Sequence, residues 1–383
     1  MRKPAARSAV PPFQVMEVLA AAAERMRTHG DAIMLCAGQP STPAPEAARR
    51  AVVDAIEGQV LGYTEAQGIL PLRKAIAEYH RRSDGIEVFP EEVVVTTGSS
   101  GGLTALALAA FDPGAVIAMA RPGYPAYRNT LSALGCEVLD LPCGPSTRFQ
   151  PTVRMLQELP QVPDGLIIAS PSNPTGTVID PEELARISTW CREHDCLLIS
   201  DEIYHGVGFG RETVSARRFG PDAVVTGSVS KYFSMTGWRL GWLLLPQWLL
   251  RPVEVLSGNL SICPPVPSQH AAIGALSTAA IGELDAHVER YAGNRELLIK
   301  RLPELGVTSY APPDGAFYAW CEVSHLTDDS ARWCAEMLAA TGVAMTPGID
   351  FDPVDGHRYV RLCFAGTAEE LNEAIDRLVR QLH

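Results

Sequence analysis

The sequence predicts a three-layer αβα fold, in which helices cover both faces of a mostly parallel sheet, together with a smaller α+β domain. The first observation is a series of short apolar runs that alternate with helical patterns, as in repeated strand–helix–strand units. Several of these runs are apolar throughout rather than alternating, which is typical of strands buried on both faces. The third observation is size, because 383 residues of ordinary globular composition, 46% hydrophobic and 20% charged, favour two domains.

We expect the chain to divide into three segments. Residues 1–37 form a proline-bearing arm with a helix over 14–28 that packs with the small domain, residues 38–270 form the large domain, and residues 271–383 form the small domain. A helical pattern over 268–302 contains no proline and predicts one long helix that bridges the two domains. In open α/β sheets ligands bind at the carboxyl ends of the strands, so the loops that follow the strands are the place to look for function.

The expected elements of the two domains follow from the same patterns. Strands of the large domain are predicted at 93–97, 115–120, 136–141, 165–170, 196–200, 223–228 and 240–245. Helices are predicted there at 103–111, 127–134 and 181–194, and Asp180 before Pro181 gives the last one an N-cap signal. The small domain is predicted to contain strands 317–323 and 359–365 and helices 329–341 and 368–382.

Charge and cysteine content exclude several classes of protein. A net charge of −12 repels phosphate backbones and anionic lipids, so nucleic acid and membranes are poor candidates as partners. We find no apolar run of the about 20 residues that a transmembrane helix needs, and no signal-peptide pattern after the basic start. Nine cysteines without a C-x-x-C pair indicate buried free thiols in a reducing cytoplasm. Cys191, His194 and Cys196 are expected to pack on an amphipathic helix rather than to bind a metal.

Three polar motifs directly follow predicted strands. Lys231 ends the segment GSVSK, where desolvation at the end of a buried strand lowers the pKa of an amine and favours its neutral form. Asp201 lies in SDEIY, where a strand meets a loop, and Asn173 lies in the proline-rich turn SPSNPTG. Each motif alone has an ordinary explanation, namely a solvated lysine in a turn, a helix cap or ion pair, and a tight turn.

Taken together, the motifs indicate one family. In this order and spacing, SPSNPTG, SDEIY, SVSK and the downstream GWRLG resemble the class I/II aminotransferases, which have fold type I and use pyridoxal 5′-phosphate (PLP). The resemblance runs from about Gly38 to the C-terminus and includes PDGAFY at 313–318 and YVRLCFA at 359–365. It implies ping-pong transfer of an amino group from an L-amino acid to a 2-oxo acid.

The resemblance assigns the central chemistry to a few residues. Lys231 would form a Schiff base with the cofactor aldehyde and then move the proton of the substrate as a general base. Asp201 would face the pyridine nitrogen and keep it protonated, which lets the ring accept electrons. Tyr204 and Asn173 would hydrogen-bond the phenolic oxygen. Arg361 would grip the substrate carboxylate as a bidentate fork, close to Asn173 and the Gly38 backbone.

The resemblance also implies how the rest of the cofactor is held. Tyr124 would stack on the cofactor ring. The phosphate would be bound by hydroxyls, amides and a guanidinium of Ser99, Ser100, Ser228, Ser230 and Arg239. The first two serines open a helix, where the helix dipole favours an anion.

Two further implications concern assembly and backbone. Tyr63, in GYTEAQG, aligns with a family tyrosine that reaches the phosphate of the neighbouring subunit, which implies a homodimer with shared active sites. The family also holds the bond after the motif asparagine in cis, so the Asn173–Pro174 bond is expected to be cis.

The sequence leaves alternatives open. The segment 98–102 (GSSGG) fits the G-x-S-x-G elbow of an α/β-hydrolase, with Ser100 as nucleophile and His325 or His357 in a triad, but this explains none of the other motifs. A PLP-sensing regulator would need a DNA-binding extension that the residues before Gly38 are too few to supply. A PLP-dependent C–S β-lyase or a racemase shares the cofactor motifs and is not separated from an aminotransferase by them.

One feature of the sequence bears on the identity of the substrate. No basic residue occurs between Arg251 and Arg290, a region where dicarboxylate-specific relatives often place an arginine for the distal carboxylate. This disfavours aspartate and glutamate, and an apolar lining would suit a neutral or aromatic side chain.

Overall fold

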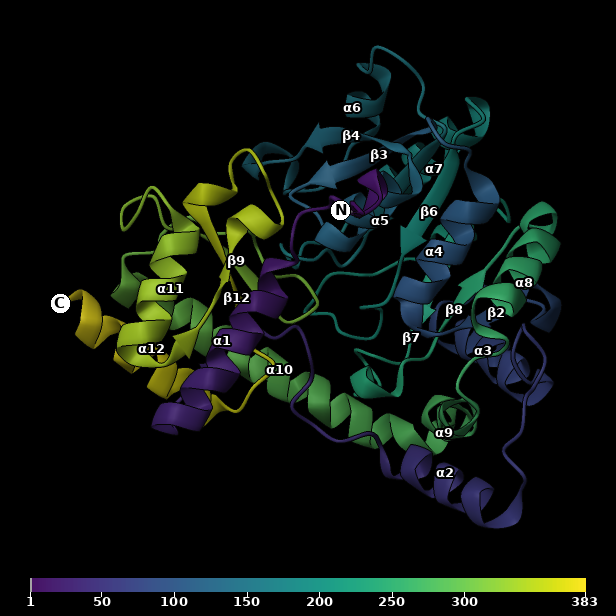
Figure 1. The fold of residues 1–383 in the computed structure, drawn as a ribbon, viewed down its shortest axis with the longest axis horizontal. Coiled ribbons are helices and arrows are strands. Elements are labelled where there is room, and N and C mark those ends of the chain that lie inside the picture. The colour runs from purple at the N-terminus through teal and green to yellow at the C-terminus, as the bar shows by residue number, and fades with distance from the viewer. Residues whose placement is uncertain (1) are drawn as a thin grey trace.

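A seven-stranded sheet forms the centre of the larger part of the molecule (Figure 1). The computed structural model describes residues 2–383. The strand order is β2-β8-β7-β6-β5-β3-β4, and only β8 runs antiparallel to its neighbours. The strands are β2 (Val93–Thr96), β3 (Val116–Arg121), β4 (Glu137–Pro142), β5 (Gly165–Ala169), β6 (Leu197–Asp201), β7 (Val224–Ser228) and β8 (Gly241–Leu244). The predicted mostly parallel α/β sheet is confirmed.

Helices cover both faces of this sheet, which explains why several of its strands have apolar residues at consecutive positions. Along β5, Leu166 and Ile168 join one hydrophobic core and Ile167 joins another on the opposite face. The helices of this part are α2 (Glu46–Gly58), α3 (Leu70–Ser83), α4 (Gly98–Ala110), α5 (Pro125–Leu134), α6 (Val153–Gln157), α7 (Pro181–Glu193), α8 (Gln247–Ser261) and α9 (Val266–Leu276). The Asp180 side chain accepts the Glu182 N–H, so the predicted N-cap of α7 is confirmed.

A second unit is built on a three-stranded antiparallel sheet in the order β11-β12-β9. Its sheet and helices are β9 (Tyr318–Glu322), β11 (Thr346–Pro347), β12 (Tyr359–Cys363), α10 (Ile281–Arg301), α11 (Ser330–Thr341) and α12 (Ala368–Leu382). Here β1 (Ile33–Met34), from the start of the chain, pairs in parallel with β10 (Val343–Ala344). The domain boundaries at 37/38 and 270/271 stay predictions.

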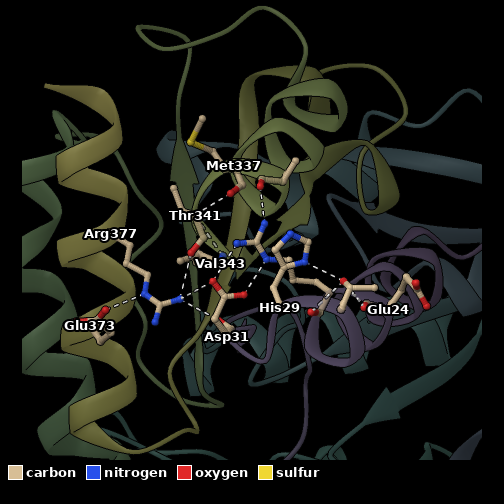
Figure 2. A network of polar contacts seen from close by, with 11 residues as sticks. Glu24, His29, Asp31, Met337, Thr341, Val343, Glu373 and Arg377 are labelled. Carbon is tan, nitrogen blue, oxygen red and sulfur yellow. Dashed lines mark hydrogen bonds and ion pairs between the residues drawn. The ribbon is translucent and has the colours of Figure 1, made fainter.

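The first helix, α1 (Gln14–His29), is tied to this second unit by a polar network (Figure 2). Arg25 on α1 donates to both carboxylate oxygens of Asp31 at 2.8 and 2.9 Å. Arg377 on α12 donates to the Asp31 carbonyl at 2.7 Å and to the Thr341 carbonyl at 3.1 Å. The network therefore joins the N-terminal helix to the C-terminal end of α11 and to the middle of α12.

The structure differs from the sequence prediction most clearly between residues 268 and 302. The predicted single helix is wrong, because α9 ends at Leu276 and a short 3-10 turn (Thr278–Ala280) precedes α10. Ser277 between them is extended, with φ −72° and ψ 158°. Gly274 packs so closely on α2 that a Cβ would lie 2.3 Å from the Ala47 carbonyl oxygen. Packing against α2 thus fixes α9, and α10 leaves in a new direction toward the second unit.

Several elements were not predicted at all, namely α2, α3, α6, α8, β1, β10 and β11. Among the described residues, we find no helix that combines the length and the apolar character needed to traverse a lipid bilayer. All nine cysteines are free thiols, and only Cys263 is not fully buried.

Candidate active site

Lys231 lies three residues beyond the end of β7, in a polar loop between the two units. Its Nζ donates a hydrogen bond to the Gly38 carbonyl at 2.6 Å. Desolvation, helped by the nearby Arg361 guanidinium, lowers the pKa of Lys231 from 10.5 to about 8. The neutral form of this amine, which a nucleophile requires, is therefore accessible near neutral pH.

Asp201 is the last residue of β6, and its side chain is buried. Its Oδ1 accepts the Ile203 backbone N–H at 3.1 Å, and its Oδ2 accepts the hydroxyl of Tyr127. Burial raises the pKa of Asp201 from 3.8 to about 6, although both hydrogen bonds favour the charged form. A buried carboxylate held in this way is suited to pair with a cationic ring nitrogen.

Tyr204 lies on the loop after β6, beside Lys231. The Lys231 Nζ is 5.6 Å from the centroid of the Tyr204 ring. The Tyr204 hydroxyl lies 2.7 Å from the Tyr318 hydroxyl, and burial raises the pKa of Tyr204 well above 10. The two phenols are thus neutral and linked, and each can still offer an oxygen or a hydrogen to a ligand.

Arg361 on β12 is 2% exposed and faces the same loop region from the other unit. Its Nη1 donates to Asn173 Oδ1 at 2.8 Å, and its Nη2 donates to the Cys36 carbonyl at 2.6 Å. Its guanidinium carbon is 4.4 Å from the Tyr318 ring centroid and 4.7 Å from that of Phe351. Its buried Nε has no hydrogen-bond partner among residues 2–383, so the guanidinium retains capacity for a carboxylate.

The start of α4 forms a cradle for an anion. Gly98 has φ +69°, and a Cβ there would lie 2.6 Å from Nη2 of Arg239, so only glycine lets the guanidinium approach the first turn. Ser99 and Ser100 are the next two residues of this helix, whose N-terminal amides and dipole favour an anion. Arg239 also lines an open cavity of about 650 Å³.

Two more predicted phosphate ligands lie on the β7 side of this cradle. The Ser228 hydroxyl donates to the Ser230 hydroxyl at 2.9 Å, and both serines are buried. A Cβ on Gly241, which pairs with Ser228, would lie 2.8 Å from the Ser99 nitrogen. The end of β7 and the start of α4 are therefore in close contact.

Tyr124 is the N-cap residue of α5, and its half-buried ring belongs to an aromatic group. Its centroid lies 5.3 Å from that of Tyr127 and 5.8 Å from that of Phe13, both in edge-to-face geometry. The pKa of Tyr124 is raised, mainly by burial and secondly by the charge of Asp201. Phe13, from the N-terminal arm, thus lies at the edge of the site.

The predicted residues fit a PLP molecule. The charges of Asp201, Arg239 and Arg361 all act on Lys231, which places an amine, a carboxylate and two cations around one site. The Asn173–Pro174 bond is cis, as predicted. Tyr63 is the exception among the predicted ligands, because its side chain is 82% exposed and its assigned role requires a neighbouring subunit.

The sequence analysis missed several residues of the site. Tyr127 lies three residues after the predicted ring-stacking Tyr124, in PGYPAY at 122–127, and Tyr318 ends the segment PDGAFY, yet the sequence analysis gives neither a role. For Tyr127 the available signal was its position soon after Tyr124, the predicted ring-stacking residue. Phe351 and the carbonyl of Cys36 come from segments that carried no motif, and only the fold places them beside Arg361.

The alternative hydrolase site is less well supported by the geometry. His325 Nε2 lies 3.0 Å from the Leu305 carbonyl, and His357 Nδ1 lies 3.1 Å from the Val354 carbonyl. In the described part of the chain, neither imidazole makes a hydrogen bond with Ser100.

Comparison with known proteins gives concordant results. Residues 30–378 match the family described as aminotransferase class I and II. A valine–pyruvate aminotransferase of Mycobacterium tuberculosis is 54% identical over 98% of this chain and 97% of its own length. An aspartate/prephenate aminotransferase of Thermus thermophilus is 33% identical over 98% of this chain and 97% of its own length.

Solved structures give the same result. The crystal structure of an aminotransferase from Mycobacterium tuberculosis aligns with a TM-score of 0.98 at 53% identity, covering 100% of this chain and 99% of the other. Aspartate aminotransferase from Thermus thermophilus with maleate aligns with a TM-score of 0.93 at 32% identity, covering 99% of this chain and all of the other. The family match favours the aminotransferase prediction over the hydrolase, and the fold type I prediction is confirmed. The chain belongs to the class I and II aminotransferases, a PLP-using family whose members move an amino group from an amino acid to a keto acid.

Proposed function

We propose that this chain is a PLP-dependent aminotransferase for amino acids with a small apolar side chain, with a short 2-oxo acid as acceptor. The observation that carries the proposal is the buried Arg361, which keeps an unpaired Nε while its guanidinium lies between the Tyr318 and Phe351 rings. It offers a carboxylate a buried positive charge that is held between two aromatic rings. Amino acid and 2-oxo acid both carry that carboxylate, so both would use the same arginine in turn.

The cofactor would be held by the residues that the fold brings together. Arg239, the two serines at the end of β7 and the start of α4 would bind the phosphate, and Asp201 would accept a hydrogen bond from the ring nitrogen. When bound, PLP supplies an electron sink for the charge left behind as the substrate loses its α-proton. Lys231, with a pKa near 8, is suited to take that proton and return it, because its neutral form is accessible at neutral pH.

The preference for an apolar side chain has two supports. The relative at 54% identity is a valine–pyruvate aminotransferase, whereas the aspartate/prephenate enzyme is only 33% identical. Phe351, 3% exposed, and the aromatic Phe13 from the N-terminal arm belong to one apolar group that lies next to Arg361. A second carboxylate would have to be desolvated against these rings.

We also propose a homodimer in which each subunit completes the site of the other. Tyr63 and Val60 are 82% and 98% exposed, which is unusual for large apolar side chains in the same loop. The role that the family resemblance gives Tyr63, on the partner's phosphate, would account for this exposure. An active monomer by light scattering would contradict the dimer.

The test is a half-reaction screen of the purified protein loaded with PLP. Each of the twenty amino acids is added without a 2-oxo acid, and loss of visible cofactor absorbance is recorded. Valine and other small apolar amino acids are expected to react fastest, and pyruvate is expected to restore the absorbance. Lys231→Ala is the control and is expected to show no turnover.

Two other outcomes would contradict the proposal. Release of pyruvate from cystathionine without a 2-oxo acid would indicate a β-lyase, and inversion of L-alanine would indicate a racemase. Fastest reaction with aspartate would contradict the proposed substrate class while leaving amino-group transfer intact.

A further inference from the structure

A cluster of four buried ionisable side chains lies near the site, and the proposed reaction does not use it. Its members are His80, Asp84, Glu202 and His205, and each side chain is at most 7% exposed. His80 is in the last turns of α3 and Asp84 directly follows that helix, whereas Glu202 and His205 follow Asp201 at the end of β6. The group therefore connects α3 to the loop that carries Asp201 and Tyr204.

The hydrogen bonds fix the protonation state of His80. The Trp242 indole N–H donates to His80 Nε2 at 2.9 Å, so this nitrogen must present a lone pair. The other nitrogen, Nδ1, lies 2.6 Å from Asp84 Oδ2 and must donate its hydrogen there. His80 is thus a neutral imidazole, held between an indole and a carboxylate.

The surroundings of His205 require the opposite state. Its Nε2 lies 3.1 Å from the Ser170 carbonyl, which can only accept a hydrogen bond. Its Nδ1 faces two carboxylates, Asp84 Oδ1 at 3.5 Å and Glu202 Oε2 at 3.7 Å. Both nitrogens therefore point at acceptors, which favours the doubly protonated imidazolium. The second Glu202 oxygen accepts the Ala216 backbone N–H at 2.8 Å.

Electrostatics agrees with this assignment. Burial by itself lowers the pKa of His205, but Glu202, Asp84 and the Ser170 carbonyl together raise it from 6.5 to about 8. The two histidines in turn hold the pKa of the Asp84 carboxyl well below its usual range, despite its burial. The buried cluster therefore contains one cation, the His205 imidazolium, and two carboxylates, those of Asp84 and Glu202.

One member of the cluster, Asp84, lines a cavity. A cavity of about 310 Å³ is lined by Asp84 and by Gly206, the residue after His205. The other ionisable groups that face this cavity are Tyr79, Arg82 and Tyr232. Burial raises the pKa of both tyrosines, so they stay neutral across the working range of pH. The cavity therefore brings water to Asp84, the carboxylate whose Oδ1 lies 3.5 Å from His205 Nδ1.

We propose that His205 is a positioning residue whose protonated ring clamps the loop of Asp201 and Tyr204 onto the turn of Ser170 to Asn173. The hydrogen bond to the Ser170 carbonyl joins the two segments directly. Asn173 at the end of that turn accepts a hydrogen bond from Arg361, so the clamp also orients the carboxylate fork. The inference rests on the proposed function only for the roles of Asp201, Asn173 and Arg361.

The clamp predicts a particular dependence on pH. The pKa of His205 is higher in the folded state, so its contribution to stability is complete below pH 6.5 and is lost as pH rises through about 8. Lys231 changes stability over a different pH interval. Its pKa is lowered from 10.5 to about 8 in the folded state, so its buried charge destabilises the fold below pH 8, and this penalty is relieved as pH rises from about 8 to 10.5. A fall in stability between pH 6.5 and 8 therefore reports on His205.

The first experiment is an NMR titration of the histidine imidazole carbons in the cofactor-free protein. One imidazole is expected to titrate near pH 8, to be missing in His205→Gln, and to move down by about one pH unit in Asp84→Asn. His194→Gln, which removes a ring bound to the Trp190 carbonyl, is the control and is expected to leave that signal unchanged. A His205 signal that titrates at 6.5 or below overturns the proposal.

Thermal unfolding and kinetics separate a clamp from a merely structural residue. Wild-type Tm is expected to fall between pH 6.5 and 8, and His205→Gln is expected to lose this fall. At pH 7 the variant is expected to raise KM for the amino acid about fivefold, as for one lost hydrogen bond. An equal Tm loss at every pH with unchanged KM overturns the clamp. If Asp84→Asn fails to fold, Glu202→Gln replaces it, and the pKa of His205 is expected to shift downward in the same way.

The two proposals can fail separately. If the wild-type protein binds no PLP and transfers no amino group, the proposed function fails. The NMR and unfolding results would still decide the protonation state of His205.

Discussion

The hydroxyl of Tyr127 on α5 donates its hydrogen to Oδ2 of Asp201 at the end of β6, while the Ile203 amide donates to Oδ1. Each carboxylate oxygen thus has its own donor in a buried site. These two donors oppose the desolvation that raises the pKa of Asp201 to about 6. Tyr127 therefore helps to keep this carboxylate charged where the ring nitrogen of the cofactor would meet it.

Tyr127→Phe removes one of the two donors and is expected to weaken PLP binding. A hydrogen bond to a charged group contributes about 1.5–3 kcal/mol, so Kd is expected to rise about 10- to 100-fold. The pKa of Asp201 is expected to rise further, because its charged form loses a partner. Titration of the cofactor-free protein with PLP, followed by visible absorbance, measures the change. Tyr310→Phe, at a half-buried tyrosine of the second unit, is the control, and equal losses in both variants would rule out this role.

Gly98→Ala tests the contact between Arg239 and the start of α4. The new Cβ would lie 2.6 Å from Arg239 Nη2, so the guanidinium must move away from the anion cradle. Gly114→Ala is a matched control, because Gly114 also has a positive φ, +94°, and no heavy atom within 4 Å of a Cβ. Both variants are expected to lose about 1–2 kcal/mol of stability from backbone strain. Only Gly98→Ala is expected to weaken binding of PLP and of inorganic phosphate, and unchanged phosphate affinity would count against the cradle.

The lowered pKa of Lys231 predicts how its reactivity depends on pH. In the cofactor-free protein, acetylation of Lys231, followed by mass spectrometry of its peptide, is expected to accelerate as pH rises through about 8, because deprotonation creates the reactive amine. Arg361→Gln removes a nearby positive charge that lowers the pKa of Lys231. The midpoint of the acetylation rate is therefore expected to move to higher pH in this variant. A midpoint near 10.5 in the wild-type protein would show that the amine is not perturbed.

Local sequence patterns were sufficient for the seven strands of the large sheet and for the motifs at their ends. Apolar runs specify strands buried on both faces whatever their neighbours are, and α12 was predicted with its observed bounds from its amphipathic period alone. Site residues that belong to a family motif, such as Lys231 and Arg361, were equally accessible, although their individual roles stay predictions.

The remaining features depend on contacts between distant segments. The break at Ser277 results from packing of α9 on α2, which the helical pattern of 268–302 does not contain. The cluster of His80 and His205 joins residues more than a hundred positions apart, and each histidine alone looks like an ordinary core residue. The motif places Tyr127 close in sequence to Tyr124, but only the fold shows that its hydroxyl donates to Asp201.

The parallel pairing of β1 with β10, which joins Ile33 to Val343, has a consequence for biosynthesis. On the ribosome, the first helix and strand leave the exit tunnel long before the segment against which they dock. At about 5–20 residues per second, that delay is on the order of half a minute. During most of this interval Ala22 on the apolar side of the N-terminal helix lacks its native partners Leu338 and Ala344. A nascent chain stalled before residue 343 should therefore be cut by protease near the amino terminus, whereas the completed polypeptide should resist cleavage there.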